Sequence, residues 1–117
     1  MGFALANTAS SLGAEVVLVT GPTSLSIKSN NIKVVNVVTA DEMFIKTKEF
    51  FLSADISILS AAVSDFKPKK SVSNKIKKDD KINLSINLVP NIDILNHLGK
   101  IKKQDQLLIG FALESDN

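Results

Sequence analysis

Few side chains of this sequence could carry chemistry, and the residue inventory excludes several kinds of site. The 117 residues contain no cysteine, so thiol nucleophiles, disulfides and zinc–thiolate sites are excluded. All 14 basic residues are lysine. Without arginine, a bound anion must be held by lysine ammonium groups, backbone N–H groups or helix N-termini. The patterns GxGxxG and GxxxxGK(S/T) do not occur, which argues against a dinucleotide or P-loop site.

Two polar features remain as candidates. Asp65 directly follows an apolar run, where a carboxylate can bind Mg²⁺ or the edge of a base, although a turn-forming role is the simpler alternative. Residues 67–81 hold half of the lysines, interrupted by acidic and small polar residues, a pattern that is also typical of a solvated loop. His97, the single histidine, falls in a predicted helix with no serine or acid at a suitable spacing. We expect it to be packed or exposed rather than catalytic.

Apolar patterns predict the elements that position these residues. Helices are expected over residues 1–12 with Gly13 as a left-handed stop, over residues 40–53 behind a capping box of Thr39 and Glu42, and after Asn91 as N-cap. Strands are expected over residues 14–20, 32–38, 55–63 and 106–112, whose apolar runs are typical of strands buried on both faces. This alternation predicts an α/β fold with a Rossmann-like, doubly wound, mostly parallel sheet. Such sheets bind ligands beyond the carboxyl ends of their strands, here residues 21–22, 59–65 and 111–117.

The segment from Lys81 to Val89 has a different period. Apolar side chains at Ile82, Leu84, Ile86 and Leu88 alternate with polar ones. This alternation predicts an exposed antiparallel strand with one apolar face. A second copy of the chain is the candidate to cover that face.

The overall composition fits one compact domain. A hydrophobic content of 44% is enough for a single core, and no apolar run approaches the roughly 20 residues that span a bilayer. No membrane partner and a cytoplasmic location are therefore expected. The net charge of +2 and the lack of Tyr, Trp and Arg argue against a nucleic-acid partner. Because the chain opens on a helix, we expect residues 1–117 to be a single truncated domain that lacks a preceding strand.

Several blocks of sequence follow one another in the order of a known family. They are MGFALA (residues 1–6), GAEV (13–16), AAVSDF (61–66), KIKK (75–78), NIDIL (91–95) and GFALE (110–114). These blocks resemble SSGKMGxALA, GAEVTLVSGP, AAVADxxP, EKIKK, LVKNPDIL and GFAAET of the phosphopantothenate–cysteine ligases. The resemblance is to the CTP-dependent bacterial type, which is often fused to a flavin-dependent decarboxylase, and it covers essentially the whole chain.

The resemblance implies a two-step ligation in coenzyme A biosynthesis. The carboxylate of 4′-phosphopantothenate attacks the α-phosphate of CTP, giving an acyl-cytidylate and pyrophosphate, and cysteine then displaces CMP. A lysine and Mg²⁺ suit this reaction, because one oxyanion must approach another. The partners implied are 4′-phosphopantothenate, cysteine, CTP with Mg²⁺, and further subunits in a homodimer or higher oligomer formed through residues 81–89.

The resemblance also assigns roles to individual residues. Lys75 would be the catalytic cation, on a flexible loop that closes over the nucleotide. Asp65 would contact the nucleotide and its metal ion. The other matched positions bind the nucleotide: Leu59, Ser60 and Ala61 at a strand end, Ile92, Asp93, Ile94 and Leu95 at a helix start, and Phe111 against the base. By its pattern alone, Phe111 would be a core residue.

The sequence departs from the family at a few positions. Asn74 replaces the Glu of EKIKK, and Pro90-Asn91-Ile92 replaces Lys-Asn-Pro. The family's Asn and Ser-Ser-Gly segment would lie before Met1, and its helix lysines would lie after Asn117. We therefore expect these 117 residues to be weakly active or inactive alone.

A function of another class is the alternative. The same fold could be a non-catalytic nucleotide-binding or assembly module that pairs through residues 81–89. Dimerisation would not separate the two hypotheses, whereas selective binding of CTP would.

Overall fold

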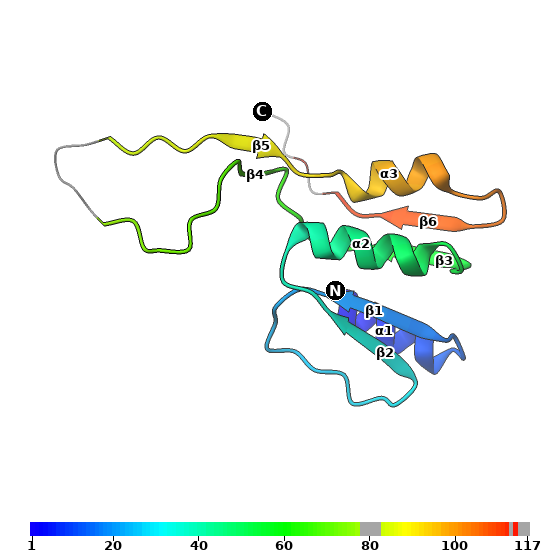
Figure 1. Cartoon of the computed structure of the whole chain (residues 1–117). Helices are drawn as coiled ribbons and strands as arrows, with labels where there is room; N and C mark the ends of the chain where they lie inside the picture. The colour runs from blue at the N-terminus through cyan, green and yellow to red at the C-terminus, as the bar shows by residue number, and fades with distance from the viewer. Residues whose placement is uncertain (78–82, 113, 115–117) are drawn as a thin grey trace.

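The computed structural model describes residues 1–77, 83–112 and 114, and places helices and strands in alternation along most of the chain (Figure 1). The helices are α1 (Gly2–Ser11), α2 (Ala40–Phe51) and α3 (Ile94–Ile101). The strands are β1 (Val16–Thr20), β2 (Ile32–Asn36), β3 (Ile56–Leu59), β4 (Phe66–Pro68), β5 (Leu88–Pro90) and β6 (Leu107–Gly110). The chain is thus a small α/β structure, as predicted.

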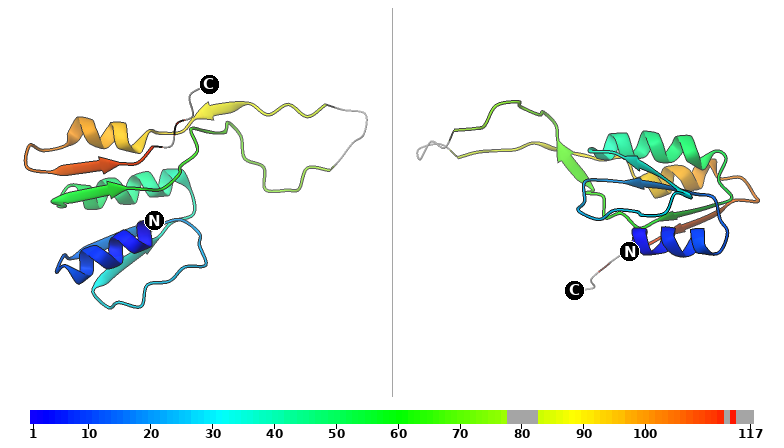
Figure 2. Two further views of the ribbon diagram at one scale, coloured as in Figure 1. Left: turned by 180° about the vertical axis from the view of Figure 1, so that it is seen from behind. Right: turned by 90° about the horizontal axis from the view of Figure 1, so that it is seen from below.

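The strands of the described ranges form three two-stranded ladders. β1 pairs with β2 and β3 pairs with β6, both in parallel, whereas β4 pairs with β5 in antiparallel fashion. The predicted single parallel sheet is therefore not seen as one continuous ladder, because no backbone bonds join β1 to β3. Both parallel ladders point their carboxyl ends toward the β4–β5 ladder (Figures 1 and 2).

Helices lie on both sides of the parallel ladders. α1 packs on β1 and β2, while α2 packs on β1 and α3 packs on β6. Seen from below, α1 lies on one side of the strands, and α2 and α3 lie together on the other (Figure 2). The core forms where α2 meets α3: Phe51, Ile94 and Leu98 are buried there, with Leu59 and Leu108 of the ladder beneath.

The helix ends confirm most of the local predictions. The Thr39–Glu42 capping box is present at α2, and Gly13 has a φ of 95° directly after α1. The predicted N-cap of α3 was wrong by two residues. The cap is Asp93, whose carboxylate accepts from Asn96 N, whereas the side chain of Asn91 is engaged elsewhere.

The strands are shorter and more exposed than predicted. β3 ends at Leu59 rather than Val63, because the chain leaves the ladder there toward β4. Burial on both faces was also wrong: Val17 is 38% exposed, Ile58 41% and Ile56 60%. Each parallel ladder has only two strands and is partly covered by helices, so the apolar runs predicted more burial than these strands have.

Residues 66–77 and 83–90, called the arm below, project from the body (Figure 1). In the described part of the predicted strand 81–89, Leu88 and Val89 belong to the ladder with β4, and Asn87 O accepts from Lys69 N at 2.8 Å just beyond it. Lys81 and Ile82 lie outside the described residues. Leu84, Ile86 and Leu88 are 65%, 60% and 58% exposed. No helix within the described ranges is long and apolar enough to cross a bilayer.

Candidate functional site

The carboxyl ends of β3 and β6 form one edge of the candidate site. Leu59 pairs with Gly110, and the N–H of Phe111 donates to Leu59 O at 3.1 Å, which carries the pairing one residue beyond the ladder. Leu59 and Ser60 are half-buried, whereas Ala61 is exposed. The predicted strand-end residues therefore lie beside Phe111, where a ligand can reach the backbone.

The start of α1 lies against this edge. A Cβ added to Gly2 would be 3.1 Å from Ser60 Oγ, so the first turn of α1 closely approaches the residue after β3. The N-cap, Met1, makes no side-chain capping bond. The first backbone N–H groups of α1 thus have no side-chain acceptor at the helix cap, beside the predicted Ser60 position.

The Asp65 turn is fixed by Asn91. The backbone N–H of Asn91 donates to Asp65 O at 2.8 Å, and its Nδ2 donates to Ser64 O at 2.7 Å. Asp65 itself is exposed. Its carboxylate is therefore free to meet solvent or a ligand, while its backbone is held from across the β4–β5 ladder.

The helix start that the resemblance assigned to the nucleotide follows Asn91 directly. Ile92 and Leu95 are 45% and 39% exposed, whereas Ile94 is buried in the core. The carboxylate of Asp93 accepts from Asn96 N at 3.0 Å. Ile94 therefore anchors the helix in the core, while Asp93 organises its first turn.

The α3 start is seated directly on the end of β6. A Cβ at Gly110 would overlap the side chain of Leu95, with Leu95 Cδ1 only 2.9 Å away. Phe111, the next residue, is 53% exposed at this edge. Its ring therefore has the exposure needed for contact with a ligand, in contrast to the core role that its pattern alone favours.

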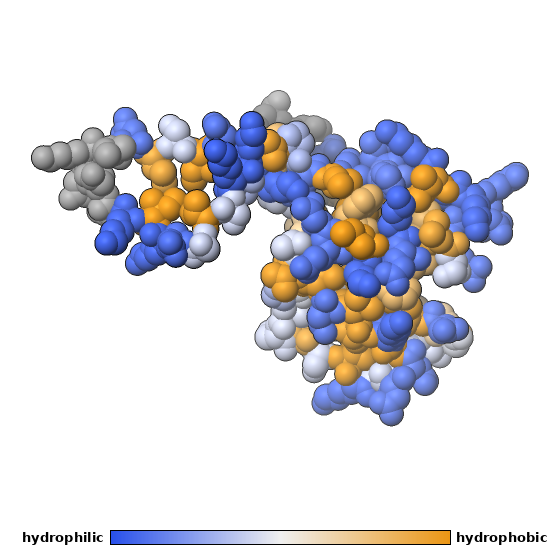
Figure 3. Space-filling model, in the orientation of Figure 1, coloured by the Kyte–Doolittle hydropathy of each residue, from blue (hydrophilic) through white to orange (hydrophobic). Residues whose placement is uncertain are grey.

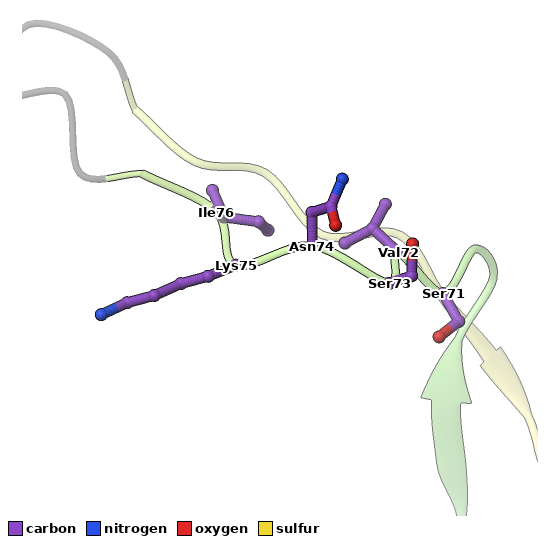
Figure 4. A pocket seen from close by; sticks show the side chains of 6 residues that line it. All are labelled: Ser71, Val72, Ser73, Asn74, Lys75 and Ile76. Atoms are coloured by element: carbon purple, nitrogen blue, oxygen red, sulfur yellow. The ribbon is translucent and has the colours of Figure 1, made fainter.

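Lys75 is the predicted site residue that lies apart from the others. It is exposed on the arm, and its side chain extends away from the neighbouring residues of the arm (Figure 4). Ser71–Ile76 line only an open depression of the arm. The structure thus brings together the strand ends, Asp65, the α3 start and Phe111, but it does not bring Lys75 to them.

Sequence reasoning missed two contacts that fix the base of the arm. One is Asn91 with the Asp65 turn. The other is Lys67, whose Nζ lies 2.7 and 2.9 Å from the two carboxylate oxygens of Asp41 in the first turn of α2. Lys67 is therefore part of an ion pair rather than simply one of a solvated run. No local signal could have revealed this partner, because Asp41 and Lys67 are far apart in sequence.

The other polar side chains of note are structural. His97 packs edge-on against Phe44, with ring centroids 4.8 Å apart, which is the packed one of the two environments expected for it. Gln106 is buried and donates to Phe51 O and Ala54 O, at 2.7 and 2.9 Å. Both residues support the core between α2, α3 and β6.

The side chains available as metal ligands suit a metal ion that arrives already bound to a ligand. Among the described residues no three His, Cys, Asp or Glu side chains gather as a metal cage. Mg²⁺ in phosphate-transfer sites is commonly held by one or two carboxylates, with the substrate phosphates and water completing its shell. A single exposed Asp65 fits that arrangement as one ligand to a nucleotide-bound ion.

Comparison with known families gives a match over the whole chain. The model of the "DNA/pantothenate metabolism flavoprotein C-terminal domain" family matches residues 1–117. Among curated relatives, a "Cysteine/Cysteine sulfinic acid decarboxylase" from an unknown prokaryotic organism is 49% identical over 100% of this chain and 32% of its own length. The "Coenzyme A biosynthesis bifunctional protein CoaBC" of Borreliella burgdorferi is 41% identical over 98% of this chain and 29% of its own length.

Solved structures agree with this match. The C-terminal domain of a coenzyme A biosynthesis bifunctional protein CoaBC superposes with a TM-score of 0.81 at 38% identity, over 99% of this chain and 52% of that one. A DNA/pantothenate metabolism flavoprotein from Streptococcus pneumoniae, at 23% identity and a TM-score of 0.69, supports the fold alone. The chain spans about half of the solved CoaBC C-terminal domain and under a third of the CoaBC protein from Borreliella burgdorferi.

Proposed function

The chain belongs to the DNA/pantothenate metabolism flavoprotein C-terminal domain family, and from this premise we propose that it takes part in the CTP-dependent ligation of 4′-phosphopantothenate with cysteine. The similarity to coenzyme A biosynthesis proteins supports the pathway. The observation that carries the site is the meeting of Asp65 with the α3 start, joined by Asn91 beside the ends of β3 and β6.

In the proposed reaction, a carboxylate oxygen of 4′-phosphopantothenate bonds to the α-phosphorus of CTP. The bond from that phosphorus to the β-phosphate oxygen breaks, and pyrophosphate leaves. The amine of cysteine then attacks the acyl carbon, CMP leaves with the bonding electrons of the acyl–oxygen bond, and the amine loses a proton to solvent. Charge must be neutralised chiefly in the first step, where two anions meet.

The residues of the site are proposed to divide this work. Leu59, Ser60 and Ala61 offer backbone to the nucleotide, residues 92–95 present the start of α3, and Phe111 packs on the base. Asp65 ligates the Mg²⁺ that CTP brings. In this proposal Lys75 neutralises the triphosphate, which requires the arm, or the arm of another copy, to approach the body.

The proposed fold of the complete domain is the doubly wound, mostly parallel sheet. Parallel ladders with helices on both sides support it. Because the chain spans about half of the solved domain it resembles, the activity is proposed for the protein together with any segments that adjoin this chain natively.

Product analysis tests the reaction. With Mg-CTP, 4′-phosphopantothenate and cysteine, we expect one pyrophosphate and one CMP per ligated product. Leaving out cysteine should stop CMP release while an acyl-cytidylate accumulates on the protein. Equal turnover with ATP, or no product from the native protein, would reject the proposed chemistry.

We also propose that the arm mediates self-association. Leu84, Ile86 and Leu88 expose apolar surface on a segment that projects from the body (Figure 3). Such surface is unfavourable in water and marks an interaction site. In sedimentation equilibrium, Ile86→Lys should shift the protein toward monomer, whereas Ser85→Lys, an equal charge on the exposed neighbouring residue, should not. A parent protein that is monomeric at all concentrations would contradict this.

A further inference from the structure

Asn91 joins the Asp65 turn to the start of α3. Its backbone N–H and its side-chain Nδ2 donate to two consecutive carbonyls, Asp65 O at 2.8 Å and Ser64 O at 2.7 Å. The preceding residue, Pro90, pairs with Phe66 but has no N–H to donate. One residue therefore fixes both carbonyls at this end of the β4–β5 ladder.

Holding the side-chain amide of Asn91 against Ser64 O is energetically unfavourable for the other atom of that amide. Its Oδ1 has almost no accessible surface and no hydrogen-bond partner within the described part of the chain. A buried acceptor without a donor is unfavourable, and functional sites are among the places where proteins keep such exceptions. The hydrogen bond to Ser64 is thus kept despite an unmet acceptor on the same amide.

Asn91 also lies between the two groups proposed to face the nucleotide. Asp65 is exposed on one side of it, and Asp93, two residues further on, caps α3. The oxygen of the Asn91 amide is enclosed by protein although the residue as a whole is half-buried, so an effect of this amide on a ligand would pass through its neighbours. A shift of Asn91 would move the Asp65 backbone and the α3 start relative to one another.

We propose that Asn91 is a positioning residue for Mg-CTP: it holds the carboxylate of Asp65 in register with the first turn of α3. This inference rests on the proposed use of CTP and adds to it a residue to which the family resemblance gave no role. The competing explanation is that the hydrogen bonds of Asn91 only stabilise the fold and do not position groups for the nucleotide.

A double-mutant cycle on CTP affinity separates the two explanations. Loss of one well-formed hydrogen bond predicts that Asn91→Ala weakens Mg-CTP binding about tenfold in a calorimetric titration of the native protein. If Asn91 acts through Asp65, the same change in an Asp65→Asn background should cost less than about twofold, because coupled residues are not additive. The KM for cysteine should stay unchanged in Asn91→Ala.

The control is Asn30→Asp against Asn91→Asp. Both changes add one negative charge, but Asn30 is exposed in the turn before β2, far from the site. Asn30→Asp should bind Mg-CTP as the parent does, whereas Asn91→Asp, which loses the donor to Ser64 O, should bind at least as weakly as Asn91→Ala.

Three outcomes would overturn the inference. They are parent-like CTP affinity in Asn91→Ala, an equal loss of affinity with and without Asp65, and a raised KM for cysteine in Asn91→Ala. If the variants do not fold, hydrogen exchange on the parent decides, since Mg-CTP should slow exchange of the Asn91 N–H and no change would refute the coupling. A parent that does not bind Mg-CTP refutes the proposed function itself, which distinguishes the two failures.

Discussion

Leu95 of α3 lies so close to Gly110 of β6 that a Cβ at position 110 would overlap Leu95 Cδ2 and sit 2.9 Å from Cδ1. The missing side chain of Gly110 leaves the space that the end of the Leu95 side chain occupies, so the start of α3 rests on the end of the strand. The relationship links two segments that the family resemblance assigned to the nucleotide. It therefore couples the seating of α3 to the edge that carries Phe111.

Adding one methyl group at this point should destabilise the protein. Gly110→Ala is expected to lower the free energy of unfolding by about 1 kcal/mol, because the new Cβ makes the partly exposed Leu95 side chain turn aside. Urea denaturation measures the change. Leu95→Ala in the same chain should recover part of the loss by making room. If Gly110→Ala alone unfolds at the parent's urea midpoint, the close contact does not exist in solution.

The cap of α3 gives a second prediction. Asp93→Ala should cost about 1 kcal/mol of stability, because Asn96 N loses its acceptor, while Asp93→Asn should keep most of it. Thermal unfolding followed by circular dichroism measures both. Asp105→Ala, in an exposed turn, serves as the control and should stay within about 0.5 kcal/mol of the parent. Equal effects at positions 93 and 105 would contradict the assigned cap.

The buried amide of Gln106 should be intolerant of charge. In Gln106→Glu the side chain can no longer donate to Phe51 O and Ala54 O, so we expect a loss of about 2 kcal/mol or more. The matched control is Gln104→Glu, at an exposed position two residues earlier, which should change stability by under about 0.5 kcal/mol. Chemical denaturation of both variants makes the comparison, and similar midpoints would be evidence against the burial.

The Lys67–Asp41 ion pair predicts a charge-swap rescue. Each reversal alone, Asp41→Lys or Lys67→Asp, should destabilise slightly, and the double reversal should recover about 0.5 kcal/mol, since both side chains are about half exposed. Added salt should shrink the recovery. Because residues 1–117 contain no cysteine, spin labels on cysteines introduced in α2 and the arm can report whether the ion pair holds the arm in place. If the double reversal does not recover stability and the distances between the labels do not change, the ion pair does not hold the arm in place.

The sequence alone was sufficient for the helices, because helix signals are local, and for the order of the elements apart from β4, which was expected to be irregular. The capping box at Thr39 and the left-handed Gly13 can each be recognised within a few residues. The cap of α3 was misassigned because Asn91 and Asp93 are both good capping residues, and a tertiary bond to Ser64 engages the first. Propensity cannot distinguish two such candidates when a distant carbonyl decides between them.

The sequence predicted residues of the candidate site only where they follow a strand or match a family motif. Asp65 was proposed because it follows an apolar run, whereas Phe111 was proposed only through the family resemblance, since its pattern favoured the core. Both residues are exposed, and their roles stay predictions. Asn91, Asp41 and Gly2 were missed because their roles arise from contacts across the fold. Burial was overestimated for Ile56 and Ile58, since apolar content does not reveal how many strands and helices cover a residue.

The most direct test is a calorimetric titration of the native protein and of Asp65→Asn with Mg-CTP, and with Mg-ATP in parallel. We expect that the parent binds Mg-CTP and not Mg-ATP, and that Asp65→Asn binds Mg-CTP at least about tenfold more weakly, because the carboxylate proposed to meet the nucleotide's metal ion is lost. Equal binding of both nucleotides, or undiminished CTP binding by Asp65→Asn, would contradict it.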